Sequence, residues 1–262
     1  MKKTQLKIIV FMGLILVYSS FIPNSASAEK TTGKYEIDTI SELKSQIKDF
    51  KDDGSLLNEE KREEIIENTK PEILEEYTED LSEKVNEATN ELSSSTQLEI
   101  DISDNEVYKN HDMKILDDGT IVEVITVDSP VLEKRPLLKA TQNYGSRSYS
   151  VKTRVYHVLY PDGWTGLVTY YNVGKGGLTA TSTSSAGTTS IFPLQISKST
   201  KITDKRAEKV GTDINGQGNY TLTYIGYNGI GLASYDRVII STIKLTKLTS
   251  KNATVSTSYT QR

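Results

Sequence analysis

Hydrophobic residues recur at two different spacings in this chain, and the change of spacing constrains the fold more than any motif does. Before about residue 96 they recur every three to four residues, which is the spacing of one face of an α-helix. After residue 97 they mostly alternate with polar residues, which is the spacing of a strand with one buried side. The sequence therefore predicts an α+β chain in which an amphipathic helical region precedes β structure.

Three helices are expected in the first region. Thr39 followed by Glu42 has the spacing of a capping box and predicts a helix over 39–53. Asn58 can cap a second helix that ends near residue 69, and Pro71 can start a third that ends near residue 95. Each of these helices is apolar along one side only, so each needs another element to pack against.

The remaining sequence is typical of β structure. Asp117-Asp118-Gly119 separates two runs of β-branched residues and predicts a small hairpin unit. The segment 149–160 alternates strictly, and turns rich in Gly or Pro separate it from later strands. About seven short strands after residue 147 predict an antiparallel sandwich-like domain. Within it, 204–210 is expected to form a helical turn and 211–219 a loop.

Charge divides the chain near residue 134. Residues 29–134 carry 30 acidic and 12 basic side chains, whereas residues 135–262 carry 5 acidic and 16 basic ones. The single tryptophan and 11 of the 15 tyrosines lie in the basic part. Net charges of −18 and +11 favour an intramolecular contact between the acidic helices and the basic β domain. The predicted organisation is a signal peptide (1–28), an acidic helical region (29–96), a small β-hairpin unit (97–128), a linker (129–146) and a basic, Tyr-rich β-sandwich domain (147–262).

The N-terminus has the three parts of a secretory signal peptide. Lys2 and Lys3 precede an apolar run over 8–21, and small residues at Ala26 and Ala28 form the cleavage site. The chain contains no cysteine, which is common among exported proteins of Gram-positive bacteria and uncommon among secreted eukaryotic domains of this size. We therefore expect a secreted bacterial protein that is extracellular or associated with the cell surface, with an uncleaved N-terminal anchor as the alternative.

The sequence offers little material for catalysis. His111 and His157 are its only histidines, so a histidine-dependent triad or a multi-histidine metal site is disfavoured, and a half-buried structural role is expected for His157. A glycan-cleaving enzyme needs two carboxylates that flank the bond, and Asp236 is the only acid expected within a long strand of the basic part. We predict a non-catalytic protein without a cofactor or a metal ion, and a glycan-acting hydrolase is the third alternative.

Aspartates near the hairpin are the one candidate for a cation site. Their spacing does not match a calcium-binding loop, and carboxylates are common in turns. Turn formation is therefore the preferred explanation. The residues concerned are Asp101, Asp104, Asp112, Asp117 and Asp118.

Aromatic side chains interleaved with cations indicate a binding surface in the basic part. Rings with a polar tip beside positive charge suit sugars, polyanions and membrane headgroups. Outside a Gram-positive cell the abundant polyanions are wall teichoic polymers and anionic lipids, so we expect an anionic cell-wall polymer or a membrane surface as the partner, and no nucleic acid. The alternative is that these rings pack in the core of a Tyr-rich β protein. The candidate ligand-binding residues are Tyr149, Arg154, Tyr156, Tyr160, Trp164, Tyr171 and Lys175.

Two functions of different classes fit these observations. In the first, the intact chain is a binding factor associated with the cell surface or envelope. In the second, the acidic region is a pro-region that masks a cationic antibacterial or membrane-active β domain until cleavage near Lys134-Arg135. Pro136 would obstruct trypsin-like cleavage after Arg135, so the intact binding factor is the preferred function.

Overall fold

The computed structural model describes residues 36–52, 59–95, 97–103, 105–131, 143–160, 163–190, 194–225 and 231–262. These residues belong to one compact unit, Tyr35–Arg262. The predicted signal peptide with Ala26 and Ala28 lies outside the described residues, and so does the Lys134-Arg135 step.

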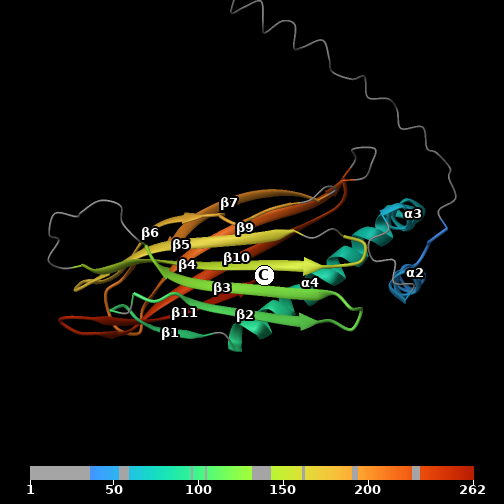
Figure 1. Cartoon of the computed structure of the whole chain (residues 1–262). Coiled ribbons are helices and arrows are strands. Elements are labelled where there is room, and N and C mark those ends of the chain that lie inside the picture. The colour runs from blue at the N-terminus through green and yellow to red at the C-terminus, as the bar shows by residue number, and fades with distance from the viewer. Residues whose placement is uncertain are drawn as a thin grey trace, which may run out of the picture. The chain divides into compact units, whose positions relative to one another are not determined.

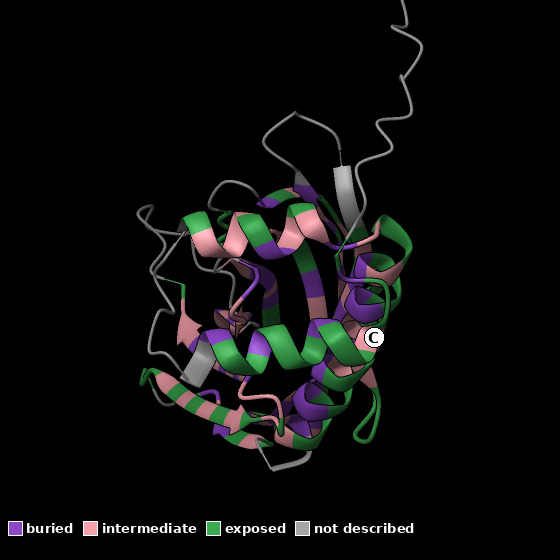
Figure 2. Cartoon of the chain, turned by 90° about the vertical axis from the view of Figure 1, so that its right-hand side faces the viewer, coloured by how far each residue is buried: buried purple, intermediate pink, exposed green. Residues whose placement is uncertain are grey.

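Three helices are present in the described part of the chain, close to the predicted positions. They are α2 (Ile40–Asp52), α3 (Glu59–Asn68) and α4 (Pro71–Ser95). The capping box is confirmed, because the Glu42 amide donates to Thr39 Oγ1 at 3.2 Å and the Thr39 amide donates to Glu42 Oε2 at 3.1 Å. Figure 2 shows buried and exposed residues on different sides of the helices, as expected for amphipathic segments.

The strands after α4 form two antiparallel sheets, so the fold is a β-rich α+β fold. In the five-stranded sheet the order is β1-β11-β10-β9-β7, and in the six-stranded sheet it is β2-β3-β4-β5-β6-β8 (Figure 1). The Asp118–Gly119 turn between β2 and β3 is confirmed by the Thr120 amide, which donates to Asp118 Oδ1 at 2.9 Å. The strands are β1 (Leu98–Asp101), β2 (Tyr108–Ile115), β3 (Ile121–Pro130), β4 (Asn143–Tyr156), β5 (Trp164–Gly174), β6 (Gly177–Ser184), β7 (Leu194–Asp204), β8 (Arg206–Ala207), β9 (Asp213–Ile225), β10 (Gly231–Leu248) and β11 (Ala253–Gln261).

Helix α4 packs against both sheets. It contacts β10 and β11 of one sheet and β2 and β3 of the other, whereas β6 contacts β7 and β9 directly. The helix therefore fills the space between the sheets along one edge. Its buried stripe contributes about 2 kcal/mol for each large apolar side chain, and it consists of Leu74, Tyr77, Leu81, Val85 and Ala88.

Polar contacts fix the end of α4 to β11. The Gln261 amide donates to Asn90 Oδ1 at 2.8 Å, and Asn90 Nδ2 donates to the Gln261 carbonyl at 2.7 Å. Ser93 also donates to the Tyr259 carbonyl. The contact between this acidic helix and β11 thus combines apolar packing with neutral hydrogen bonds, and Glu91 of α4 also forms an ion pair with Lys114 of β2.

Strand pairing joins segments that the charge pattern separates. β1 comes from the acidic part and pairs with β11, and β3 pairs with β4 from Ile121↔Tyr156 to Pro130↔Arg147. The strands of the predicted hairpin unit (97–128) therefore lie in the same two sheets as those of 147–262. Pro130 is the last residue of β3, where a proline interrupts no central ladder.

Two local predictions are wrong. The segment 204–210 forms no helical turn, because β7 runs to Asp204 and β8 pairs with β6 through Leu178↔Ala207. The segment 211–219 is strand from Asp213 onward, because β9 pairs with both β7 and β10. In both places tertiary pairing overrides the local preference of the sequence.

Within the described residues, no helix is both long enough and apolar enough to cross a membrane.

Candidate binding face on the six-stranded sheet

Alternation along β4 separates the two sides of the six-stranded sheet. Thr153 Oγ1 donates to Gln261 Oε1 of β11 at 3.0 Å, so the side of β4 that carries Thr153 points toward the other sheet. The alternate residues of β4, such as Lys152 and Arg154, therefore point outward. In Figure 1, β3, β4 and β5 lie in front of α4, and this outward side is turned toward the viewer. We define the outer face by the residues in register on this side, which include His111, Met113, Ile115, Ile121, Glu123, Ile125, Lys152, Arg154, Tyr156 and Trp164.

The structure brings three of the seven predicted surface residues together on the outer face. The Arg154 guanidinium carbon lies 4.1 Å from the centre of the Tyr156 ring and 5.5 Å from that of the Trp164 ring. Arg154 and Trp164 are also direct cross-strand partners. A cation between two rings forms a preorganised group that holds both ring planes in place.

Three other predicted residues are core residues. Tyr149 and Tyr171 are fully buried, and Tyr160 is 5% exposed. Tyr149 lies on the inward side of β4, as its odd position relative to Arg154 and Tyr156 dictates, so the alternation of 149–160 already contained this information. Tyr160 packs against Tyr224 with ring centres 4.1 Å apart and the ring planes tilted by 31°.

Lys175, the seventh residue, lies in the turn between β5 and β6. It lines a hollow of about 420 Å³ at the end of the sheet away from Trp164. Arg206 and Glu208, which follow β7, line the same hollow.

Glu123 extends the aromatic group and was missed by the sequence reasoning. Tyr156 Oη donates to Glu123 Oε2 at 2.8 Å, and His111 Nε2 lies 2.7 Å from Glu123 Oε1. The Glu123 side chain is only 13% exposed, whereas that of His111 is 53% exposed. The largely buried carboxylate of Glu123 therefore fixes the position of the Tyr156 hydroxyl, whereas His111 is exposed to solvent. Alternation in the hairpin was the signal that could have identified both residues.

Apolar side chains border this group along β2. Met113 is 59% exposed and Ile115 is 63% exposed. They pair with Glu123 and Ile121 on β3. β2 alternates exposed and intermediate residues along its length, and Figure 2 shows such an alternation as green and pink stripes. The outer face thus combines rings, a fixed cation and an apolar border.

Comparisons with protein-family models, with curated proteins and with solved structures gave no match. The chemical interpretation of the outer face therefore depends on its own residues and their geometry.

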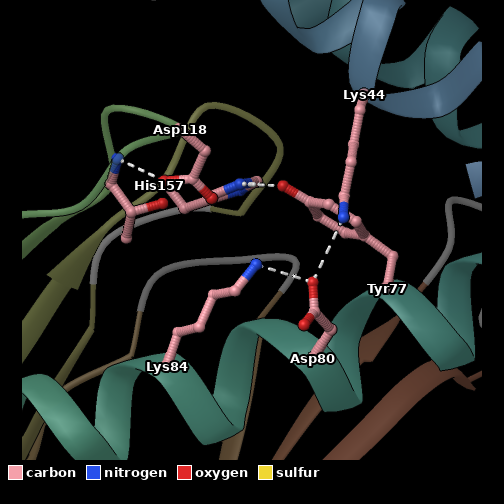
Figure 3. A network of polar contacts seen from close by, with 7 residues as sticks. Lys44, Tyr77, Asp80, Lys84, Asp118 and His157 are labelled. Atoms are coloured by element: carbon pink, nitrogen blue, oxygen red, sulfur yellow. Dashed lines mark hydrogen bonds and ion pairs between the residues drawn. The ribbon is translucent and has the colours of Figure 1, made fainter. Parts of the chain in front are cut away.

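His157 occupies a separate, interior cluster beside α4. Its Nδ1 accepts from the Leu159 amide at 3.1 Å, so the neutral ring carries its proton on Nε2, 2.9 Å from Tyr77 Oη. The pKa of His157 is lowered to about 4, mainly by burial; the charge of Asp118 opposes this shift and that of Arg62 adds to it. Figure 3 shows the ring between Asp118 and Tyr77. Both ring nitrogens are used, as in the expected structural role.

A buried ion pair lies on the inward side of the same sheet. Arg147 Nε donates to Asp128 Oδ1 at 2.5 Å, and Tyr171 Oη donates to Asp128 Oδ2 at 2.7 Å. Burial raises the pKa of Asp128, and the hydrogen bond and charge of Arg147 oppose that shift. The hydrogen bonds of this group are directed inward, so we assign it to the core.

The acidic candidates have local partners. Asp101 accepts from Ser103 and Asn252, and Asp118 closes its own turn. Asp236, the acid in the long strand, accepts from Thr221 at 2.7 Å. Asp104 lies outside the described residues. Among the residues that the structure describes, no three metal-ligating side chains gather in one place.

Proposed function

We propose that this chain is an exported, non-catalytic binding protein of the cell surface or envelope, and that its outer face contacts an anionic glycopolymer. The observation that carries the proposal is the group Trp164–Arg154–Tyr156, in which one cation is held between two rings on an outward side of a sheet. Sugar rings present apolar C–H faces that pack on aromatic rings, and a guanidinium pairs with an anionic substituent beside them.

Rigidity supports binding by this group. The Tyr156 hydroxyl is held by Glu123, and Arg154 is held between the two rings, so little side-chain freedom is lost when a ligand binds. The strands beneath are paired on both sides in β3, β4 and β5. A ligand therefore meets a preformed surface.

The packing of α4 favours the intact chain over the pro-region alternative. The helix buries Leu81 and Val85 against the strands, and β1 completes the five-stranded sheet beside β11. Removal of the acidic part would expose this apolar surface and an edge of β11. We therefore propose a sandwich-like arrangement in which the helices are permanent parts of the binding protein, and the signal peptide directs its export.

The experiment is a binding titration of the chain without residues 1–28 against purified wall glycopolymer. Trp164→Ala should weaken binding roughly 30-fold, as expected for a central aromatic residue, and Trp164→Phe should retain most of the affinity. Val238→Ala, on the opposite sheet, is the matched control for loss of an apolar side chain. Affinity should also fall steeply with salt. Unchanged binding by folded Trp164→Ala would refute the proposed function.

A further inference from the structure

A second group of outward polar and cationic residues lies at the far end of the outer face. Asn172 of β5 pairs with Thr179 of β6, and Thr179 pairs with Arg206 of β8. Ser146 of β4 pairs with Asn172 on the other side and donates to its Oδ1 at 2.8 Å. These residues form one row across four strands, and three of them, with Lys175, line the 420 Å³ hollow.

The hollow carries a net positive charge. Lys175 and Arg206 line it together with a single acid, Glu208. Arg206 and Glu208 are 3.7 Å apart with both side chains 68% exposed, so their attraction is weak and Arg206 can reorient toward an anion. Lys205 and Lys209 are exposed beside them.

The hollow exists because β8 approaches the β5–β6 turn closely. Gly177 has a φ of 98°, and a Cβ at this position would overlap the Ala207 carbonyl oxygen. The Ala180 amide donates to the Lys205 carbonyl at 2.9 Å, which holds the strand segment that carries Arg206 in place. The position of Arg206 is therefore defined by backbone contacts.

A strip of polar outward residues on β4, two serines and a lysine, lies between the hollow and the aromatic group. Between Arg154 and Ser146, the outward positions of β4 are Lys152, Ser150 and Ser148. Eight residues of an antiparallel strand span about 27 Å. Ser148 lies 3.1 Å from Ser129 of β3, oxygen to oxygen, so hydroxyl groups line the strip from two strands.

We propose that the hollow is a second binding subsite, which takes an anionic group of the same polymer chain that contacts Trp164 about 27 Å away. The inference rests on the proposed function and specifies its ligand as an extended, phosphate-linked glycopolymer of several repeats. A single sugar or a short oligomer can occupy one subsite but cannot reach both. Joining two weak sites through one ligand raises affinity by effective concentration.

The test uses two synthetic glycosylated poly(glycerol phosphate) oligomers, one shorter and one longer than the strip, together with an oligouronate as long as the longer one. The variant is Lys175→Ala/Arg206→Ala. The matched control is Lys198→Ala/Lys201→Ala on β7, which removes the same charge from exposed positions of the other sheet. Thermal denaturation establishes that each variant is folded.

The double variant should lose about tenfold in affinity for the long oligomer and less than about twofold for the short one, with the control unaffected. Equal losses for both oligomers, or an equal loss in the control, would overturn the subsite. Tighter binding of the oligouronate than of the phosphate oligomer would overturn the assignment to phosphate. If Trp164→Ala weakens binding but the double variant does not, the subsite alone fails. If neither weakens binding, the proposed function fails as well.

Discussion

The outward sides of the two sheets differ although both cover the same interior. On the six-stranded sheet this side presents Trp164, Arg154 and Tyr156 with an apolar border. On the five-stranded sheet Tyr220 and Arg237 point inward, where they hydrogen-bond to Gly166 and Thr165 of β5. The outward residues of that sheet are mostly hydroxyl, amide and charged side chains, with Val238 and Ile240 of β10 also among them.

Several of these polar side chains bond to one another across the strands. Thr221 donates to Asp236 at 2.7 Å, and the Thr223 and Ser234 hydroxyls are 3.2 Å apart. Such pairs satisfy each other and stabilise a sheet surface in water. The exposed aliphatic side chains of Met113 and Ile115 on the six-stranded sheet form no such hydrogen bonds, so their exposure does not stabilise the sheet in this way. This difference supports the proposal that the ligand-binding face lies on the six-stranded sheet.

The largest effect is expected in the shared interior. Asp128→Ala should lower the free energy of unfolding by about 4 kcal/mol, because it leaves the Arg147 charge buried without its carboxylate. Urea denaturation measures this loss. Asp128→Ala/Arg147→Met should recover part of it, and a loss below about 1 kcal/mol in the single variant would contradict the assignment of this pair to the core.

The buried His157 predicts that the stability of the protein depends on pH. The pKa of His157 is about 4 in the folded protein against 6.5 as its ordinary value, so below pH 6.5 the unfolded chain binds a proton that the folded chain does not. Stability should therefore fall as the pH decreases from 6.5 to 4, by up to about 3 kcal/mol from this group. The groups that face the ring are Tyr77, Tyr160, Asp118 and Arg62.

His157→Gln is the variant that isolates this contribution. Its stability at pH 7 should be lower by about 1 kcal/mol, its stability should depend less on pH between 6.5 and 4, and its ligand binding should be unchanged. Loss of glycopolymer binding in folded His157→Gln would contradict the purely structural role of this residue.

Gly177 and Gly211 allow the steric cost of an added side chain to be measured separately from the cost of a left-handed backbone conformation. Gly177 and Gly211 both have a left-handed φ, of 98° and 92°, but only at Gly177 would a Cβ meet other atoms. Gly211→Ala should cost about 1 kcal/mol and Gly177→Ala about 2 kcal/mol more, measured by thermal denaturation. Equal losses of stability in the two variants would mean that β8 can move away from residue 177 at no cost. The backbone contact would then not fix the shape of the hollow.

The smallest stability effects are expected on the two outward sides. Arg154→Ala and Thr221→Ala should each change the free energy of unfolding by less than about 1 kcal/mol, because both residues are at the surface. Their effects on glycopolymer binding should differ, with a loss for Arg154→Ala only. Equal binding by the two variants would remove the distinction between the sheets.

Local patterns predicted the elements, and long-range pairing decided their arrangement. The capping box at Thr39 and the alternation of 149–160 depend on neighbours in sequence, so the α2 start and the two sides of β4 could be predicted. The pairing of β1 with β11 depends on residues more than 150 positions apart, and no local spacing encodes it. Charge changes sign near residue 134, but the pairing of β3 with β4 crosses that position, and the acidic residues of the helices lie opposite the apolar sides that join the core.

The candidate site was predictable only in part for a similar reason. Composition selected Trp164, Arg154 and Tyr156 correctly as outward residues, but it selected the buried Tyr149 and Tyr171 equally. The alternation of side chains along β4 distinguishes the inward Tyr149 from the outward Arg154 and Tyr156. Glu123 and Arg206 are placed on the outer face only by the pairing of their strands with β4 and β6.

The bonds between α4 and β11 have a consequence for how the protein acquires its structure. Asn90 and Gln261 are 171 residues apart, and β11 lies between β1 and β10 in its sheet. Hairpins such as β2–β3 can form from local contacts, but the interior stays open until β11 arrives, so folding should be slow and cooperative. A chain exported as proposed would therefore stay extensible during passage through a membrane channel and would close only on the far side, once β11 has emerged.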